Sequence, residues 1–116
     1  MQTPNRSGHA RRAIEVALKS ARQSMQGGDY AKAEAVCKQA LNDWRSASGS
    51  KAEEGDIVTT LGKCYEAQRK YEQAYELYMD ALPHLTGSAY DDVYSCLLYL
   101  NERMGAFQSK ADEKPS

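Results

Sequence analysis

The sequence predicts an all-α fold, an antiparallel array of helix hairpins with about two repeats and a C-terminal capping helix. The string "YAKAEAV" at residues 30–36 returns as "YEQAYEL" at residues 71–77, 41 residues downstream. Apolar positions within each copy recur at intervals of three and four residues, which places them on one face of an α-helix. Because one helix hairpin cannot bury its apolar face alone, a unit repeated at this interval indicates a stacked array.

Two helices form the first predicted hairpin. Residues 1–8 have the composition of a disordered tail, and a first helix is expected from residue 9 to residue 26. Gly27 and Gly28 end this helix, and the side chain of Asp29 can cap the next one. That second helix is expected to run from Tyr30 to about Ala47.

The second hairpin follows the same plan. Ser50 and Glu53 have the spacing of a capping box, which opens a third helix from residue 51 to residue 68. A fourth helix starts at Tyr71. Pro83 removes a backbone donor and restricts the residue before it, so this helix should end or kink there.

A closing helix completes the array. It is expected to begin at Ser88 and to end at Gly105, with Phe107 opening a vestigial sixth helix. The predicted domain therefore spans residues 9–107, and residues 108–116 form a second disordered tail.

Composition and cysteine usage exclude several classes of protein. No apolar run approaches the roughly 20 residues of a membrane helix, and no apolar stretch of a secretory signal follows the N-terminal arginines. The three cysteines are widely spaced and include no C-x-x-C pair, which indicates reduced thiols and no zinc site. We therefore expect a cytoplasmic protein. Three arginines without an acid in the first 14 residues leave a mitochondrial presequence as the minor alternative.

Charge is distributed unevenly along the chain. Residues 1–51 hold nine Lys/Arg and four Asp/Glu, a net charge of +5, whereas residues 52–116 hold six and twelve, a net charge of −6. In a stacked array this makes one end basic and the other acidic. Ordinary solvated helix faces are one explanation of this uneven charge. The alternatives are that the charge steers an acidic partner to the first helices, or that it favours head-to-tail contact between copies.

The stretch "LGKCYEAQRKYEQAYELYMDAL", residues 61–82, resembles a tetratricopeptide repeat. The residues that carry the resemblance are Leu61, Gly62, Tyr65, Tyr71, Ala74, Tyr78, Ala81 and Leu82. Gly62 would let the two helices of a unit cross closely, since it has no side chain. The period of 41 residues exceeds the roughly 34 residues usual in this family and looks like that of the kinesin-light-chain-type branch.

The resemblance implies a binding module, an adaptor or scaffold. In such arrays the first helix of each pair lines a concave groove, and a peptide or helix of a partner protein lies along it. The residues expected in the groove are Leu18, Arg22, Met25, Thr59, Lys63, Glu66, Tyr99 and Arg103. The alternative function is self-assembly or docking through the terminal helices, with Tyr90, Tyr94 and Leu98 as the assembly surface.

Nothing in the sequence indicates catalysis. No serine or cysteine stands in a nucleophile motif, and no glycine-rich phosphate loop is present. The acidic pairs at 53–54 and 91–92 favour helix capping over metal binding. We therefore expect no enzyme activity, no cofactor and no metal. Binding of nucleic acid is not expected either, because the net charge is −1.

Overall fold

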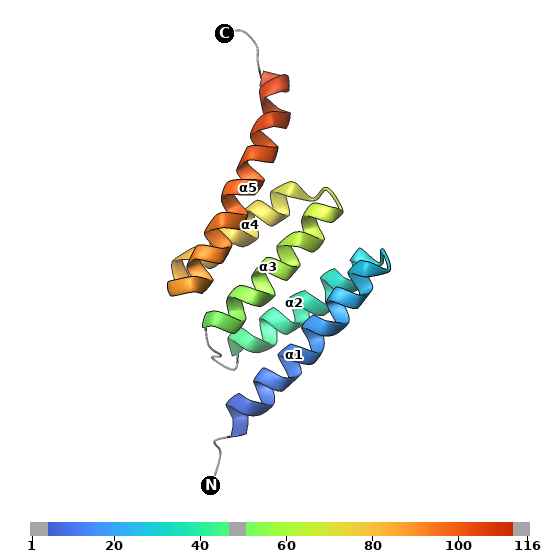
Figure 1. The fold of residues 1–116 in the computed structure, drawn as a ribbon, viewed down its shortest axis with the longest axis vertical. Coiled ribbons are helices and arrows are strands. Elements are labelled where there is room, and N and C mark those ends of the chain that lie inside the picture. Colours follow the sequence, from blue (N-terminus) through green and yellow to red (C-terminus); the bar gives the residue numbers. More distant parts are fainter. Residues whose placement is uncertain (1–4, 47–50, 113–116) are drawn as a thin grey trace.

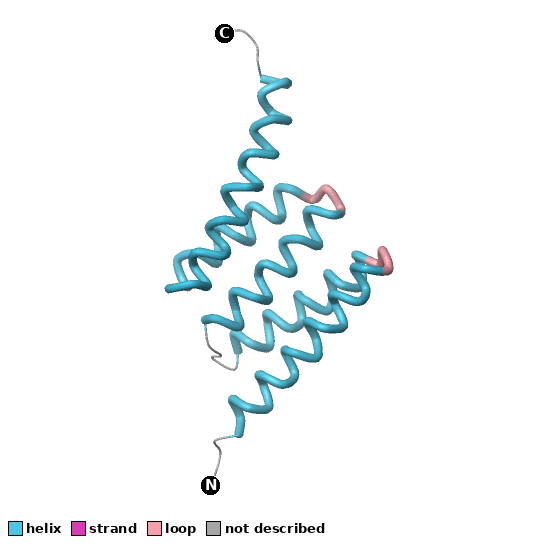
Figure 2. Tube along the Cα trace, in the orientation of Figure 1, coloured by secondary structure: helices cyan, strands magenta, loops and turns pink. Residues whose placement is uncertain are grey.

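The computed structural model describes residues 5–46 and 51–112, and within them the side chains of residues 11–46 and 53–105. Five α-helices and a short 3-10 helix follow one another, and no strand occurs in the described ranges (Figures 1 and 2). The elements are α1 (Asn5–Gln26), α2 (Tyr30–Ser46), α3 (Lys51–Ala67), α4 (Tyr71–Ala81), η1 (Leu82–His84) and α5 (Gly87–Asp112). The predicted all-α array of helix hairpins is confirmed.

The helices stack in chain order. Helix α1 pairs with α2 and α3 pairs with α4, while α3 also packs on α1 and α2, and α5 packs on α3 and α4. The odd-numbered helices therefore follow one another along the array, as the first helices of successive repeats do. Helix α5 continues past α4 and projects from the rest of the array (Figure 1). None of the described helices combines the length and apolarity that crossing a membrane requires.

Tight turns join the two helices of each hairpin. Between α1 and α2, Gly28 has φ 85°, a left-handed conformation that favours glycine. The Oδ1 atom of Asp29 then accepts a hydrogen bond from the backbone N–H of Lys32 at 3.2 Å, which confirms the predicted cap. Between α3 and α4, Arg69 has φ 64°, and the N–H of Lys70 donates to the carbonyl of Tyr65 at 2.8 Å.

Several predicted boundaries are wrong. Helix α1 begins at Asn5, within the segment expected to be a tail, and α5 begins at Gly87 instead of Ser88. Helix α5 also passes through Gly105 to Asp112, so the described residues contain no stop at 105 and no separate sixth helix. A lone glycine costs a helix only about 1 kcal/mol, and Gly105 lies in open space. The predicted cap at Ser50 lies outside the described residues.

Pro83 acts as predicted. Helix α4 ends at Ala81, and the chain makes one 3-10 turn before Leu85, whose φ of −108° and ψ of 156° are extended. Leu85 is nevertheless buried, like Trp44 at the matching position of the first copy. Trp44 and Leu85 are therefore both buried, although Trp44 lies in a regular helix and Leu85 in an extended segment.

The core follows the repeated stripe. Its largest fully buried side chains are Tyr78, Ile57, Leu61, Leu100, Val58, Val93, Cys37 and Cys64. Ala33 and Ala74, which match across the 41-residue offset, are both completely buried. Alanine at these positions lets the two helices of each hairpin approach closely.

Two glycines of α3 lie at close helix contacts. A Cβ atom on Gly62 would overlap the ring and hydroxyl of Tyr78 on α4, which confirms the expected role of this glycine. A Cβ atom on Gly55 would lie 2.9 Å from the Cβ atom of Ala89 on α5. No local sequence pattern indicates this second contact. Glycine therefore sets the packing distance of α3 on α4 and on α5.

Candidate functional site

Helices α1, α3 and α5 together present a surface that we call the α1–α3–α5 face. Its residues are Arg22 and Met25 of α1, Asp56, Thr59, Lys63 and Glu66 of α3, and Asp92, Cys96, Tyr99 and Arg103 of α5. The helices pack side by side in the order α1, α3, α5. Each helix contributes residues three, four or seven positions apart, the spacing that keeps side chains on one helix face.

Arg22 and two aspartates meet at the upstream part of this face. Partial burial raises the pKa of Asp56, and Arg22 opposes the rise, while the carboxylates of Glu53 and Asp92 add to it. Charges from α1, α3 and α5 thus influence the same carboxyl group. The exposed guanidinium of Arg22 is partly compensated by Asp56 without being enclosed by it.

Lys63 of α3 lies near the half-buried thiol of Cys96 on α5 and affects its pKa. Burial raises the pKa of the half-buried Cys96 thiol, whereas Lys63 opposes the rise and Glu66 adds to it. Lys63 is exposed and follows Arg22 by 41 residues, the repeat period. The structure therefore presents one exposed cation from each of the first two repeats on a common face.

Arg103 holds the downstream part of the face in place. Its Nη2 atom donates a hydrogen bond to the hydroxyl of Tyr71 at 3.3 Å, and its guanidinium carbon lies 5.6 Å from the ring centroids of both Tyr71 and Tyr99. Its Nη1 atom lies 3.9 Å from Glu66 Oε1, and Glu66 Oε2 accepts the hydroxyl of Tyr78 at 3.0 Å. The Tyr99 ring therefore lies against the Arg103 guanidinium, and 58% of Tyr99 stays exposed.

The residues predicted for the groove divide into three groups. Arg22, Lys63, Tyr99 and Arg103 are exposed on the α1–α3–α5 face. Met25, Thr59 and Glu66 are half-buried; Met25 packs against the core and Thr59 donates to the carbonyl of Asp56 at 3.1 Å. Leu18 is only 5% exposed, so its predicted place on the groove surface is wrong. It follows Ile14 by four residues and precedes Ala21 by three, which puts it on the buried stripe of α1.

The predicted assembly residues form a second exposed surface, which we call the α5 stripe. Tyr90, Tyr94 and Leu98 are all exposed and lie four residues apart on α5. The rings of Tyr90 and Tyr94 stack with centroids 5.9 Å apart and an interplanar angle of 20°. The stripe exists as a surface, and its role in assembly stays a prediction.

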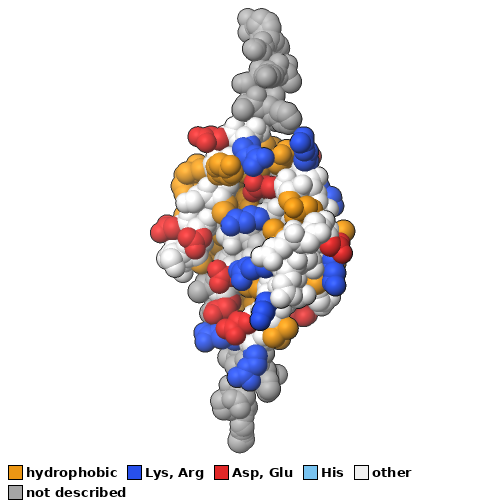
Figure 3. Space-filling view, turned by 45° about the vertical axis from the view of Figure 1, so that its right-hand side comes forward, with side chains coloured by type: hydrophobic (Ala, Val, Ile, Leu, Met, Phe, Trp, Pro, Cys, Tyr) orange, Lys and Arg blue, Asp and Glu red, His pale blue; other side chains and the backbone are white. Residues whose placement is uncertain are grey.

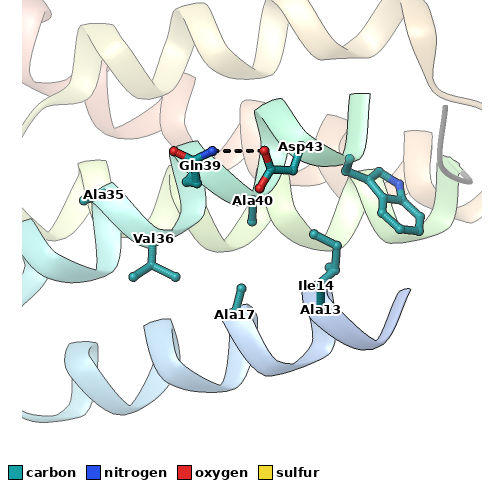
Figure 4. A pocket seen from close by; sticks show the side chains of 9 residues that line it. Ala13, Ile14, Ala17, Ala35, Val36, Gln39, Ala40 and Asp43 are labelled. Carbon is teal, nitrogen blue, oxygen red and sulfur yellow. Dashed lines mark hydrogen bonds between the residues drawn. The ribbon is translucent and has the colours of Figure 1, made fainter. Parts of the chain in front are cut away.

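One surface feature was missed by the sequence analysis. A groove of about 400 Å³ opens between α1 and α2 (Figure 4). Among the residues that line this α1–α2 groove are Ala13, Ile14, Ala17, Val36, Ala40 and Trp44. The sequence signal that points to it is the pair of small residues Ala13 and Ala17, one turn apart on α1. Small side chains on two adjacent helices leave a hollow wherever no third helix fills it.

The surface shows no segregation of charge on the side drawn in Figure 3. Basic and acidic side chains alternate there, with apolar side chains between them. Such a face lacks the single-sign patch on which nucleic acid binding depends. Within the described ranges, no group of three or more His, Cys, Asp or Glu is arranged to hold a metal ion.

A family model described as tetratricopeptide repeat matches residues 13–86, from α1 through the segment that follows η1. No curated protein and no solved structure matches the chain.

Proposed function

The chain belongs to the tetratricopeptide repeat family, a non-catalytic module that generally mediates protein–protein interaction, and on that premise we propose that its α1–α3–α5 face binds a peptide or helix of another protein. The observation that carries the proposal is the set of polar and aromatic side chains left exposed on this face. Arg22 and Lys63 offer charge, and Tyr99 offers a fixed aromatic surface.

The chemistry of the face favours a partner segment with acidic side chains. Arg22 and Lys63 are exposed and can each take a carboxylate from a ligand that lies across α1 and α3. Asp56 lies near Arg22 and near Asp92, and the two carboxylates would repel a uniformly acidic segment there. The preferred ligand therefore carries spaced carboxylates and not an unbroken acidic run.

Tyr99 supplies the apolar part of the proposed contact. A tyrosine ring that is already ordered loses little conformational freedom on binding, which is why tyrosine and arginine recur at the centres of interfaces. The guanidinium carbon of Arg103 lies 5.6 Å from the centroid of the Tyr99 ring, a contact that favours one orientation of the ring. An apolar or aromatic side chain of the partner would cover the exposed side of that ring.

The proposal includes an adaptor or scaffold role in the cytoplasm. Cys37 and Cys64 are fully buried and Cys96 is half-buried, and all three are free thiols. Reduced cysteines of this kind suit a reducing compartment.

The test is affinity purification from the cells that make the protein, with bound proteins quantified by mass spectrometry. Wild type is compared with Arg22→Glu/Lys63→Glu and with a control, Lys32→Glu/Arg69→Glu, that reverses two exposed charges outside the α1–α3–α5 face. We expect the first variant to lose at least ten-fold of the specific partner while its helical circular dichroism is retained. Equal recovery by all three proteins would refute the proposal.

A second candidate function is stacking through the terminal helices. The exposure of Tyr90, Tyr94 and Leu98 on one side of α5 favours it. Exposed apolar patches with polar borders often mark contact sites.

A further inference from the structure

Helix α4 carries a row of acidic side chains that no cation of the same helix offsets. Glu72, Glu76 and Asp80 are exposed and lie four residues apart, and α4 contains no Lys or Arg. None of the three is in an ion pair within the described part of the chain. Like charges at this spacing repel one another, and Asp80 places an anion in the last turn, where the helix dipole disfavours it. The row therefore opposes the stability of α4 and points to a role outside the fold.

Two of these acids line a hollow beside α4, which we call the α4 hollow. Its volume is about 660 Å³, and the residues that line it include Glu76, Asp80, Tyr75 and Met79 of α4 and Tyr65 of α3. Met79 is 45% exposed and Tyr75 is half-buried, so apolar surface lies next to the carboxylates. A cationic side chain with a long aliphatic stem matches both kinds of surface.

Tyr65 brings a buried hydroxyl to the α4 hollow. Only 8% of this residue is exposed, and its hydroxyl makes no hydrogen bond within the described ranges. Tyr78, by contrast, donates its hydroxyl to Glu66 at 3.0 Å. Nearly all buried polar groups in proteins have a partner, so an unpaired one that lines a hollow indicates that a ligand supplies the partner.

The cations near Tyr65 are already paired. Burial raises the pKa of Tyr65, and Lys38 and Lys70, which lie near it, oppose the rise. Glu34 holds both lysines, because its Oε1 atom lies 3.0 Å from Nζ of Lys70 and its Oε2 atom 3.5 Å from Nζ of Lys38. The charges of these lysines are compensated, whereas those of the α4 acids are not. The α4 hollow therefore attracts a cation.

We propose that the α4 hollow binds an arginine side chain on a basic segment of a second partner protein. A guanidinium has five N–H donors in a planar fork, enough for the carboxylates of Glu76 and Asp80 and the hydroxyl of Tyr65. The aliphatic stem of the arginine packs on Met79. Lysine has three donors on a compact, strongly hydrated ammonium, which fits this set of acceptors less well. Glu72, one turn before Glu76, meets a further cation of the same segment.

The α4 hollow is separate from the α1–α3–α5 face. None of the residues that bind the arginine belongs to that face, so binding at the two surfaces is independent. A chain that holds one protein on the α1–α3–α5 face and another in the α4 hollow bridges the two proteins.

The test uses a fluorescent, alanine-based helical peptide with two arginines four residues apart, and matched peptides with lysine or glutamine at both positions. Binding is measured by fluorescence anisotropy at physiological salt. Wild type is expected to bind the arginine peptide most tightly, the lysine peptide more weakly and the glutamine peptide not at all. Glu76→Gln/Asp80→Asn keeps the shapes of the side chains and should weaken binding of the arginine peptide about ten-fold. Tyr65→Phe removes only a hydroxyl and should weaken it about five-fold.

Controls separate the α4 hollow from net charge and from folding. Glu15→Gln/Glu102→Gln removes two exposed acids of α1 and α5 and is expected to bind the arginine peptide like wild type. Tyr65→Phe is expected to unfold at the same urea concentration as wild type or a higher one, because no internal hydrogen bond is lost.

Three results would overturn the proposal. The first is a wild-type protein that binds the arginine and glutamine peptides equally. The second is an equal loss of affinity in Glu15→Gln/Glu102→Gln and Glu76→Gln/Asp80→Asn, which would reduce the effect to net charge. The third is a wild-type mass above 12.9 kDa in sedimentation equilibrium that Glu76→Gln/Asp80→Asn returns to the monomer, because a second copy would then occupy the α4 hollow.

Discussion

The contact between Gly62 and Tyr78 gives a prediction of definite sign. We expect Gly62→Ala to destabilise the protein, although alanine is the better helix former. The added Cβ atom would overlap the hydroxyl, Cζ and Cε1 atoms of Tyr78. Tyr78 is fully buried, so its ring cannot move aside into solvent. To make room, α3 and α4 must separate or the ring must rotate away from its partner, Glu66.

The expected magnitude follows from three contributions. Overpacking a core typically costs about 1–3 kcal/mol. Losing the hydrogen bond from the Tyr78 hydroxyl to Glu66, 3.0 Å long, costs about 1.5–3 kcal/mol, because the acceptor is charged. Replacing glycine by alanine inside a helix returns about 1 kcal/mol. If the ring rotates, all three contributions apply and the net loss of unfolding free energy is about 3 kcal/mol; if the helices separate and the hydrogen bond is kept, the net loss is about 1 kcal/mol. Either is a sizeable part of the stability of a domain this small.

The assay is urea unfolding followed by circular dichroism at the helix band. The matched control is Gly105→Ala, the same substitution in open space on α5, which is expected to stabilise by up to about 1 kcal/mol. Tyr78→Leu is also combined with Gly62→Ala, and the double variant should lose less than the two single losses together, because the smaller side chain leaves room for the methyl group. If Gly62→Ala stabilised the protein as Gly105→Ala does, the close helix crossing would be refuted.

Three further predictions concern contacts between helices. Burial raises the pKa of Glu34, but hydrogen bonds from Gln68 and Lys70 outweigh this effect and hold the pKa below its ordinary value of 4.5. Glu34→Gln should therefore lower the free energy of unfolding by about 1 kcal/mol at pH 7. The difference from wild type should vanish as the pH falls below 4.5 and the carboxylate of Glu34 is protonated, which urea unfolding at pH 7 and pH 3 checks. Gly55→Ala should cost about 1–2 kcal/mol by forcing α3 and α5 apart, measured by urea unfolding; an increase in stability would contradict the packing. Glu54 is only 5% exposed, and its Oε2 atom lies 3.0 Å from Nε of Arg45. Arg45→Met removes this guanidinium and should lower the free energy of unfolding by about 2 kcal/mol. In thermal melts, Arg45→Met/Glu54→Gln should recover part of the lost stability, because the buried charge is gone.

Local patterns predicted the helices well, for a physical reason. The apolar stripe, the glycines at 27–28 and the proline at 83 act within one or two turns of chain, so the sequence around them determines their effect. The burial of Ala33 and Ala74 followed from the repeat. The predicted end of the helix at Gly105 was wrong, because a single glycine destabilises a helix by less than the remaining residues of a long helix stabilise it.

Contacts between distant helices could not be predicted in the same way. The close approach of Gly55 to Ala89 depends on how α5 crosses α3, and no local pattern encodes that distance. Leu18 was a different kind of error, because its spacing to Ile14 and Ala21 already places it on the buried stripe of α1. The α1–α2 groove is a property of two adjacent surfaces, and neither helix alone reveals it.

The proposed function depends on contact between the α1–α3–α5 face and the partner protein. The most direct measurement is photo-crosslinking in the cells that make the protein, with a photoreactive amino acid placed at Lys63 or at Tyr99 and, as a control, at the exposed Glu76 of α4. Binding on this face predicts that Lys63 and Tyr99 give crosslinks to the same discrete protein and that position 76 gives none to it. Crosslinks to that protein from position 76, with none from Lys63 or Tyr99, would contradict it.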